Sequence, residues 1–227
     1  MIPLKDDLSA VRPPVLTVGL IAVNVAAFLW QWLVAGIDVS VLRGGLIPLE
    51  AITLRDVGPP DLVPPPLTIF TSMFLHGSFA HIGGNMLFLW IFGNNVEDAL
   101  GHVRFLAFYL ISGVAAAAAQ TGLSYAVGDL QTPMVGASGA IAGVLAGYWV
   151  MFPRARILTL IPIFFFIRLV YLPASFFIGA WFVFQLLGAF LGGGGGGVAF
   201  MAHIGGFAAG LLLVQIWRPR RRTRGGW

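Results

Sequence analysis

Six long apolar stretches constrain the fold of this chain more than any other feature of its sequence. They cover residues 15–34, 79–95, 105–127, 135–152, 169–191 and 198–217. A helix needs roughly 17–25 apolar residues to cross the hydrocarbon layer of a bilayer. Because 58% of the residues are hydrophobic and only 10% are charged, a soluble core cannot bury this much apolar surface. The stretches are continuous rather than alternating, which favours helices over barrel strands. The sequence therefore predicts an all-α polytopic protein with six spans and the lipid bilayer as its partner.

The basic residues indicate how the six predicted spans are oriented. If the N-terminus is inside, eleven Lys and Arg residues lie on the inner side, and only Arg43 and Arg55 lie outside. Cytoplasmic loops of membrane proteins carry such an excess. We therefore expect a cytoplasmic segment at residues 1–14, a membrane domain at 15–217 and a basic cytoplasmic tail at 218–227. The positive charge is then a topology signal, and no nucleic-acid partner is expected.

Two segments between the predicted spans need separate interpretations. The first outside loop, residues 35–78, is long and contains six prolines from position 48 to position 66, so we expect a structured extracytoplasmic insertion. The run at residues 157–167 is apolar but has only eleven residues and ends at Arg168. It is too short to span, and we expect a re-entrant or interfacial piece before the fifth span.

Four polar side chains are predicted to share one layer near the outer side. His81 and Asn85 lie in the first turns of the second span, Ser138 in those of the fourth, and His203 in those of the sixth. With the orientation above, all three spans run from outside to inside. Polar groups inside spans are costly, so each of them indicates a functional site.

Ser138 and His203 form a plausible nucleophile and base. Taken alone, Ser138 could be a small residue at a helix contact, and His203 could simply satisfy a neighbouring carbonyl. Together they fit catalysis better, because neutral imidazole can take the proton of an adjacent hydroxyl. Small residues recur at four-residue spacing on both helices and predict close packing that brings the pair together: Gly139, Gly143 and Gly147 on one, Ala202, Gly206 and Gly210 on the other.

The remaining residues of the layer suggest an oxyanion hole rather than the acidic third member of a catalytic triad. Asn85, His81 and the backbone N–H of Ser138 can stabilise an oxyanion, and His76 lies at the mouth as a supporting residue. No carboxylate is predicted at this depth, which favours a Ser–His dyad over a triad. No HExxH pattern or acidic partner accompanies the histidines, so neither a metal nor a cofactor is expected.

These motifs resemble those of the rhomboid intramembrane serine proteases in their bacterial six-span form. The resemblance covers residues 68–214 and rests on three motifs in order, which are His76-x4-His81-x3-Asn85, Gly136-Ala137-Ser138-Gly139 and Ala202-His203-Ile204-Gly205-Gly206. The run Gly93-Asn94-Asn95-Val96-Glu97-Asp98 also looks like a family motif. The resemblance implies cleavage of transmembrane segments of single-span or polytopic proteins, in the inner membrane of a bacterium. It makes Ser138 the nucleophile and His203 the base, with His81 and Asn85 in the oxyanion hole.

The resemblance also carries one departure and leaves two alternatives open. Some relatives place an aromatic four residues after the nucleophile, against the base histidine, whereas this chain has Ala142. We therefore expect another group, such as Phe207 or a residue of the second span, to hold His203, or the ring to be held more loosely. The resemblance implies a fifth span and adjoining loop that move to admit substrate, and the six glycines at residues 192–197 predict a mobile connector there. The alternatives are an inactive relative that binds membrane helices and, with less support, a small transporter.

Overall fold

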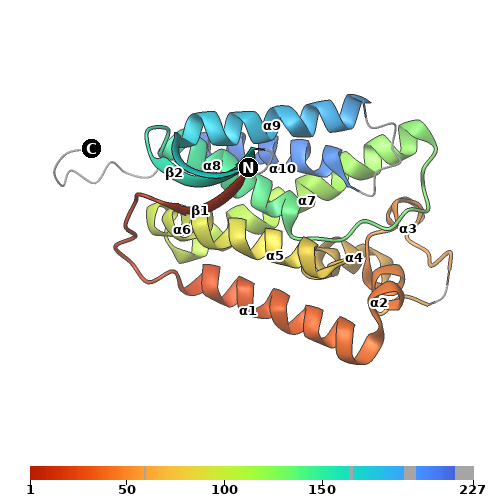
Figure 1. The fold of residues 1–227 in the computed structure, drawn as a ribbon. Helices are drawn as coiled ribbons and strands as arrows, with labels where there is room; N and C mark the ends of the chain where they lie inside the picture. Colours follow the sequence, from red (N-terminus) through yellow and green to blue (C-terminus); the bar gives the residue numbers. More distant parts are fainter. Residues whose placement is uncertain (59, 164–165, 192–197, 218–227) are drawn as a thin grey trace.

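Long apolar helices lie side by side in the protein, which we describe from a computed structural model (Figure 1). The structure describes residues 1–58, 60–163, 166–191 and 198–217. The predicted glycine connector at 192–197 and the basic tail at 218–227 lie outside the described residues. The α-helices are α1 (Val15–Trp30), α2 (Ile37–Gly44), α3 (Pro48–Thr53), α4 (Thr68–Thr71), α5 (Phe79–Phe88), α6 (Asn94–Leu100), α7 (His102–Val127), α8 (Ser138–Met151), α9 (Ala174–Leu191) and α10 (Phe200–Ile216).

The helices agree with the predicted apolar stretches, although their lengths differ. Within the described chain, three helical segments are long and apolar enough to cross a membrane, namely Val15–Ala35, which is α1 with the π-helical η1 (Gln31–Ala35), together with α7 and α9. The second predicted span, residues 79–95, covers α5, the π-helical η4 (Leu89–Gly93) and the first two residues of α6. The helices α8 and α10 have 14 and 17 residues, so α8 is only about 21 Å long.

A three-stranded antiparallel sheet corrects the prediction of an all-α fold. Its order is β1 (Ile2–Asp6), β2 (Arg156–Ile163) and β3 (Phe166–Pro173), with Ile2 opposite Leu160 and Arg156 opposite Pro173. Residues 157–163 of the run that was predicted to be a re-entrant or interfacial piece belong to strand β2. Isoleucine, valine and threonine suit strands, and pairing with both neighbours satisfies the backbone of a run too short to span. The sheet lies toward one end of the bundle, and α2 and α3 lie at the opposite end (Figure 1).

The same sheet moves the start of the fifth helix. The apolar stretch was predicted to span from residue 169, but residues 169–173 continue strand β3, and α9 begins at Ala174 after Pro173. Proline has no backbone N–H, so it is tolerated at the end of a strand or just before the first turn of a helix, which is where Pro173 lies. Hydropathy alone does not separate an apolar strand from the helix that follows it.

The predicted small-residue stripes bring α8 and α10 into backbone contact. A Cβ added at Gly206 would collide with the carbonyl oxygen of Gly139, and one added at Gly210 would collide with that of Gly143. Helix α10 also packs along α7. Glycine at these positions therefore sets the distance between the two helices that carry Ser138 and His203.

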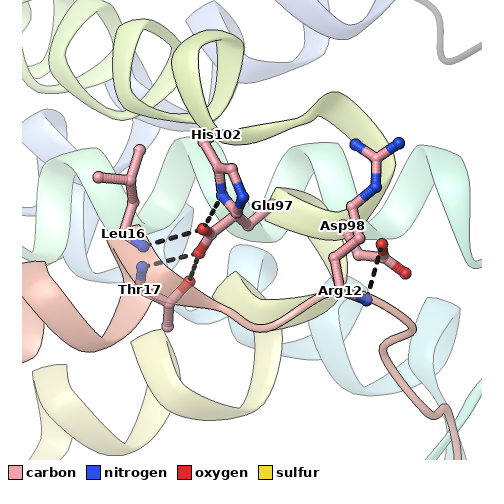
Figure 2. Close-up of polar contacts among 6 residues, drawn as sticks. All are labelled: Arg12, Leu16, Thr17, Glu97, Asp98 and His102. Atoms are coloured by element: carbon pink, nitrogen blue, oxygen red, sulfur yellow. Dashed lines mark hydrogen bonds and ion pairs between the residues drawn. The ribbon is translucent and has the colours of Figure 1, made fainter.

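The N-terminal end of α1 is held by a carboxylate from another helix. Glu97 of α6 accepts hydrogen bonds from the backbone N–H groups of Leu16 (2.9 Å) and Thr17 (2.7 Å) and from the Thr17 hydroxyl (2.7 Å), and Nδ1 of His102 lies 2.6 Å from it (Figure 2). The first N–H groups of a helix have no intrahelical acceptor, and α1 has no capping side chain of its own. Glu97 supplies the missing cap and fixes α1 against the bundle.

The first loop is folded, as its prolines predicted. It contains α2, α3, α4 and the 3₁₀ turns η2 (Pro65–Leu67) and η3 (Ser72–Phe74). Leu46 pairs through both backbone groups with Met134, at 2.9 and 2.8 Å, which ties this loop to the segment that precedes α8.

Candidate active site

Ser138 is the first residue of α8, and the segment before it sets its position. Gly136 has φ +122°, which is left-handed backbone open to glycine but strained for other residues. The sequence predicted a helix from residue 135, but α8 begins at Ser138. The backbone N–H of a first helical residue has no intrahelical acceptor and lies at the positive end of the helix dipole. Ser138 thus offers a hydroxyl and a free backbone donor at one point.

The hydroxyl of Ser138 contacts the imidazole of His203 on α10. The distance from Oγ to Nε2 is 2.7 Å, which is a short hydrogen bond between groups 65 residues apart in sequence. Packing holds both helices in place, since a Cβ added at Gly139 would lie 2.5 Å from the Cβ of Ala116 on α7. Gln120 of α7 also accepts the backbone N–H of Ala202 at 3.3 Å. The structure brings together the two residues that were predicted to form a dyad.

The ring of His203 is held from α9, by residues that the sequence reasoning missed. Its Nδ1 lies 2.7 Å from Oε1 of Gln185, and the indole of Trp181 packs beside the ring at a tilt of 37°, with centroids 5.9 Å apart. Neither of the two supports named from the sequence is the one found: Phe207 stacks on Phe182 at 4.2 Å, and among the described residues the polar and ring contacts of His203 come from Gln185, Ser138 and Trp181. The signal was present in the sequence, since a glutamine inside an apolar span is as unusual as a histidine.

His81 and Asn85 lie on the side of Gly136 next to the nucleophile. A Cβ added at Gly136 would lie 2.6 Å from Nε2 of His81 and 3.6 Å from Nδ2 of Asn85. Asn85 is 7% exposed, and its Nδ2 has no hydrogen-bond partner in the described chain. A buried amide donor without a partner is rare and costly. The Nδ1 of His81 accepts a long bond of 3.5 Å from the backbone N–H of Gly77, which favours the tautomer with the proton on Nε2. Two N–H donors are therefore available beside Ser138.

His76 is buried behind this pair rather than at the mouth of the site. Its ring contacts that of His81 edge-on at 5.1 Å and that of Phe28 at 6.5 Å, and neither of its ring nitrogens has a partner in the described structure. Burial, with a smaller contribution from His81, lowers the pKa of His76 to about 4. Gln31 fixes its backbone by donating to the His76 carbonyl and accepting the His76 N–H. His76 is thus a neutral packing residue that supports His81.

The candidate site contains one cavity of about 710 Å³. Its walls include Ser138, His203, His81, Asn85, Gln120 and Trp181. Asp129 is the one carboxylate among its lining residues, and the side-chain contacts of Ser138 and His203 involve no acid. Over the described residues, no group of three or more His, Cys, Asp or Glu side chains could hold a metal. The cavity can accept a chain segment and present a serine, a base and two donors to it.

The fold and this site define a polytopic membrane protein with a part-buried serine–histidine pair. The Rhomboid domain matches residues 66–220, and the chain therefore belongs to the rhomboid family. It is 32% identical over 181 residues to the mitochondrial Rhomboid protein 1 of Saccharomyces cerevisiae, covering 74% of this chain and 49% of that protein. It is 39% identical over 90 residues to the mitochondrial presenilin-associated rhomboid-like protein of Homo sapiens, covering 38% of this chain and 22% of that protein.

A third relative shows the same partial match, and the share of each relative that the chain covers limits what can be inferred from the similarity. The chain is 37% identical over 76 residues to the chloroplastic Rhomboid-like protein 11 of Arabidopsis thaliana, covering 34% of this chain and 26% of that protein. The chain spans about half the length of the yeast relative and about a quarter of the others. The names of these relatives place them in mitochondria or chloroplasts, so the prediction of a bacterial inner membrane finds no support in them.

Proposed function

We propose that this protein is an intramembrane serine endopeptidase that cleaves transmembrane segments of other membrane proteins. The observation that carries the proposal is the 2.7 Å contact between Ser138 Oγ and His203 Nε2 inside the cavity. Membership of the rhomboid family supports it. The substrate is a single-span or polytopic protein whose helix locally unwinds, because a peptide bond within an intact helix is covered by its own backbone.

Each step of the reaction has a group in place. His203 Nε2 accepts the Ser138 proton as Oγ forms a bond to the peptide carbonyl carbon, which puts a negative charge on the carbonyl oxygen. The backbone N–H of Ser138, Nδ2 of Asn85 and Nε2 of His81 can donate to that oxygen. The imidazolium of His203 then gives its proton to the leaving nitrogen as the C–N bond breaks. A water molecule, activated by the same imidazole, hydrolyses the ester. No cofactor takes part.

The bundle provides six spans in this proposal, with both termini on the cytoplasmic side. The run from α5 to the start of α6, helix α8 and helix α10 supply the second, fourth and sixth spans, in that order, and all of them carry site residues. A short α8 starts inside the hydrocarbon layer, which is about 30 Å thick. This arrangement puts Ser138 below the membrane surface, in a cavity that water can enter from the outer side.

A cleavage assay with purified protein in liposomes tests the proposal. The parent protein should cut a model single-span substrate and should react with a fluorophosphonate. Ser138→Ala and His203→Ala should lose both activities, with losses of at least about a thousandfold. Ser112→Ala is the matched control, because Ser112 is a buried serine of the helix interface whose hydroxyl has no partner in the described chain. It should keep parental activity.

The alternative of an inactive relative that binds membrane helices predicts a different outcome. Such a protein would retain substrate in a pull-down but would show no cleavage and no labelling by the fluorophosphonate. Equal cleavage by the parent and by Ser138→Ala would contradict the protease mechanism outright.

A further inference from the structure

Gln185 is a buried polar residue on an otherwise apolar face of α9. It is 8% exposed, and the residues around it in the helix are Phe, Val and Leu. A polar side chain in such a position is expensive and indicates a function. Its amide contacts two groups, Nδ1 of His203 at 2.7 Å and the backbone carbonyl of Trp181 at 3.2 Å.

These two contacts determine which nitrogen of His203 carries the proton. The Trp181 carbonyl can only accept, so the NH₂ group of Gln185 must face it, and Oε1 must face His203. Oε1 can only accept, so Nδ1 of His203 must donate and carries the proton. In a neutral imidazole the other nitrogen is then an acceptor, and this is Nε2, which faces the Ser138 hydroxyl.

We propose that Gln185 is a positioning residue that holds His203 in the tautomer able to take the Ser138 proton. The inference rests on the proposed protease function and deepens it by adding a third, uncharged member behind the dyad. The amide oxygen takes the place that a carboxylate occupies in a serine triad, where it orients the imidazole and sets its tautomer. Trp181 restricts the ring from one face. Because both residues belong to α9, the state of the base depends on how α9 is seated.

Gln185→Met tests this role, since methionine keeps the length of the side chain but removes the strong acceptor. Without this acceptor, the two neutral tautomers of His203 compete. We expect kcat to fall about five- to tenfold, which is the effect of one lost hydrogen bond, and KM to stay within twofold of the parent value. Fluorophosphonate labelling should slow by the same factor. Phe184→Leu is the control, because Phe184 is the neighbouring residue and is 65% exposed. It should leave both rates unchanged. A kcat of Gln185→Met within twofold of the parent would overturn the proposal.

The tautomer itself can be measured without any activity. Protein labelled with nitrogen-15 histidine, held above neutral pH in lipid bicelles, distinguishes protonated from unprotonated ring nitrogens by NMR. In the parent, Nδ1 of His203 should carry the proton, and in Gln185→Met the two forms should mix. Phe184→Leu should leave the ring as in the parent, because the Phe184 side chain is 65% exposed. A parent protein with the proton on Nε2 would refute the inference. A parent that shows the Nδ1 proton but cleaves nothing would refute the protease function and leave the tautomer assignment standing.

Discussion

Replacement of Glu97 by glutamine removes the charge that caps α1 and barely changes the shape of the side chain. The two carboxylate oxygens serve different donors. One accepts the Leu16 N–H and lies against His102, and the other accepts both the N–H and the hydroxyl of Thr17. Glutamine has one acceptor oxygen and one NH₂ group. Whichever way the amide turns, at least one backbone N–H at the start of α1 faces another donor.

The expected loss of stability follows from these contacts. A lost hydrogen bond to a charged group is worth about 1.5–3 kcal/mol, and the remaining bonds, once they involve a neutral amide, are about half as strong. Together these effects amount to about 3 kcal/mol. For a chain of this size, 1 kcal/mol shifts Tm by roughly 2–4 °C, so Tm should fall by roughly 6–12 °C.

Thermal unfolding in one detergent, followed by circular dichroism, measures this shift. Asp98→Asn is the matched control, since Asp98 lies next in the chain in a more exposed position. It accepts the N–H group of Val11 at 2.9 Å and that of Arg12 at 3.3 Å (Figure 2). Water can replace these bonds, and Tm should fall by no more than about 3 °C. Equal shifts for Glu97→Gln and Asp98→Asn would show that burial of the cap does not matter and would refute the reasoning.

The same carboxylate predicts a dependence on pH. Glu97 lies beyond the second predicted span. Burial alone would raise its pKa, but the hydrogen bonds from Leu16, Thr17 and His102 lower it more, and its pKa lies below the ordinary value of 4.5. A group whose pKa is lowered in the folded state stabilises the fold above its ordinary pKa and loses that effect as the pH falls through the folded value. The difference in Tm between the parent and Glu97→Gln should therefore be constant near neutral pH and shrink below about pH 4.5.

Three further substitutions test the packing, the N-terminal strand and the oxyanion donors. Gly206→Ala should lower Tm by several degrees and reduce cleavage, because its Cβ would collide with backbone, whereas Gly179→Ala, with open space around it, should not lower Tm. Tyr148→Phe removes the 2.7 Å bond to Asp6, and hydrogen exchange of the β1 amides should become about fivefold faster while α8 stays protected. Asn85→Ala should lower kcat by about 10²–10³, because it removes an oxyanion donor. Tm should stay unchanged, because Nδ2 of Asn85 has no hydrogen-bond partner in the described structure. A loss of kcat below tenfold would exclude Asn85 from the oxyanion hole.

Length, hydropathy and residue spacing by themselves determined the helical membrane architecture and the identity of the four polar residues in the site. An apolar stretch longer than about 17 residues has few alternatives to a spanning helix, because lipid offers the backbone no partner. The glycine stripes likewise predicted the contact of α8 with α10, since only small residues allow backbones to meet. These are local or periodic properties, which a sequence displays directly.

Tertiary structure alone decided the features that depend on pairing between distant segments. Residues 157–163 became part of strand β2 because the N-terminal residues and β3 pair with them, and no pattern within the run shows that. Glu97 became the cap of α1, 80 residues away, through the way α6 meets that helix. The support of His203 came from Gln185 on α9 rather than from its own helix or from the position of Ala142. The sequence shows that a buried donor or acceptor needs a partner, but only the folded chain shows which residue supplies it.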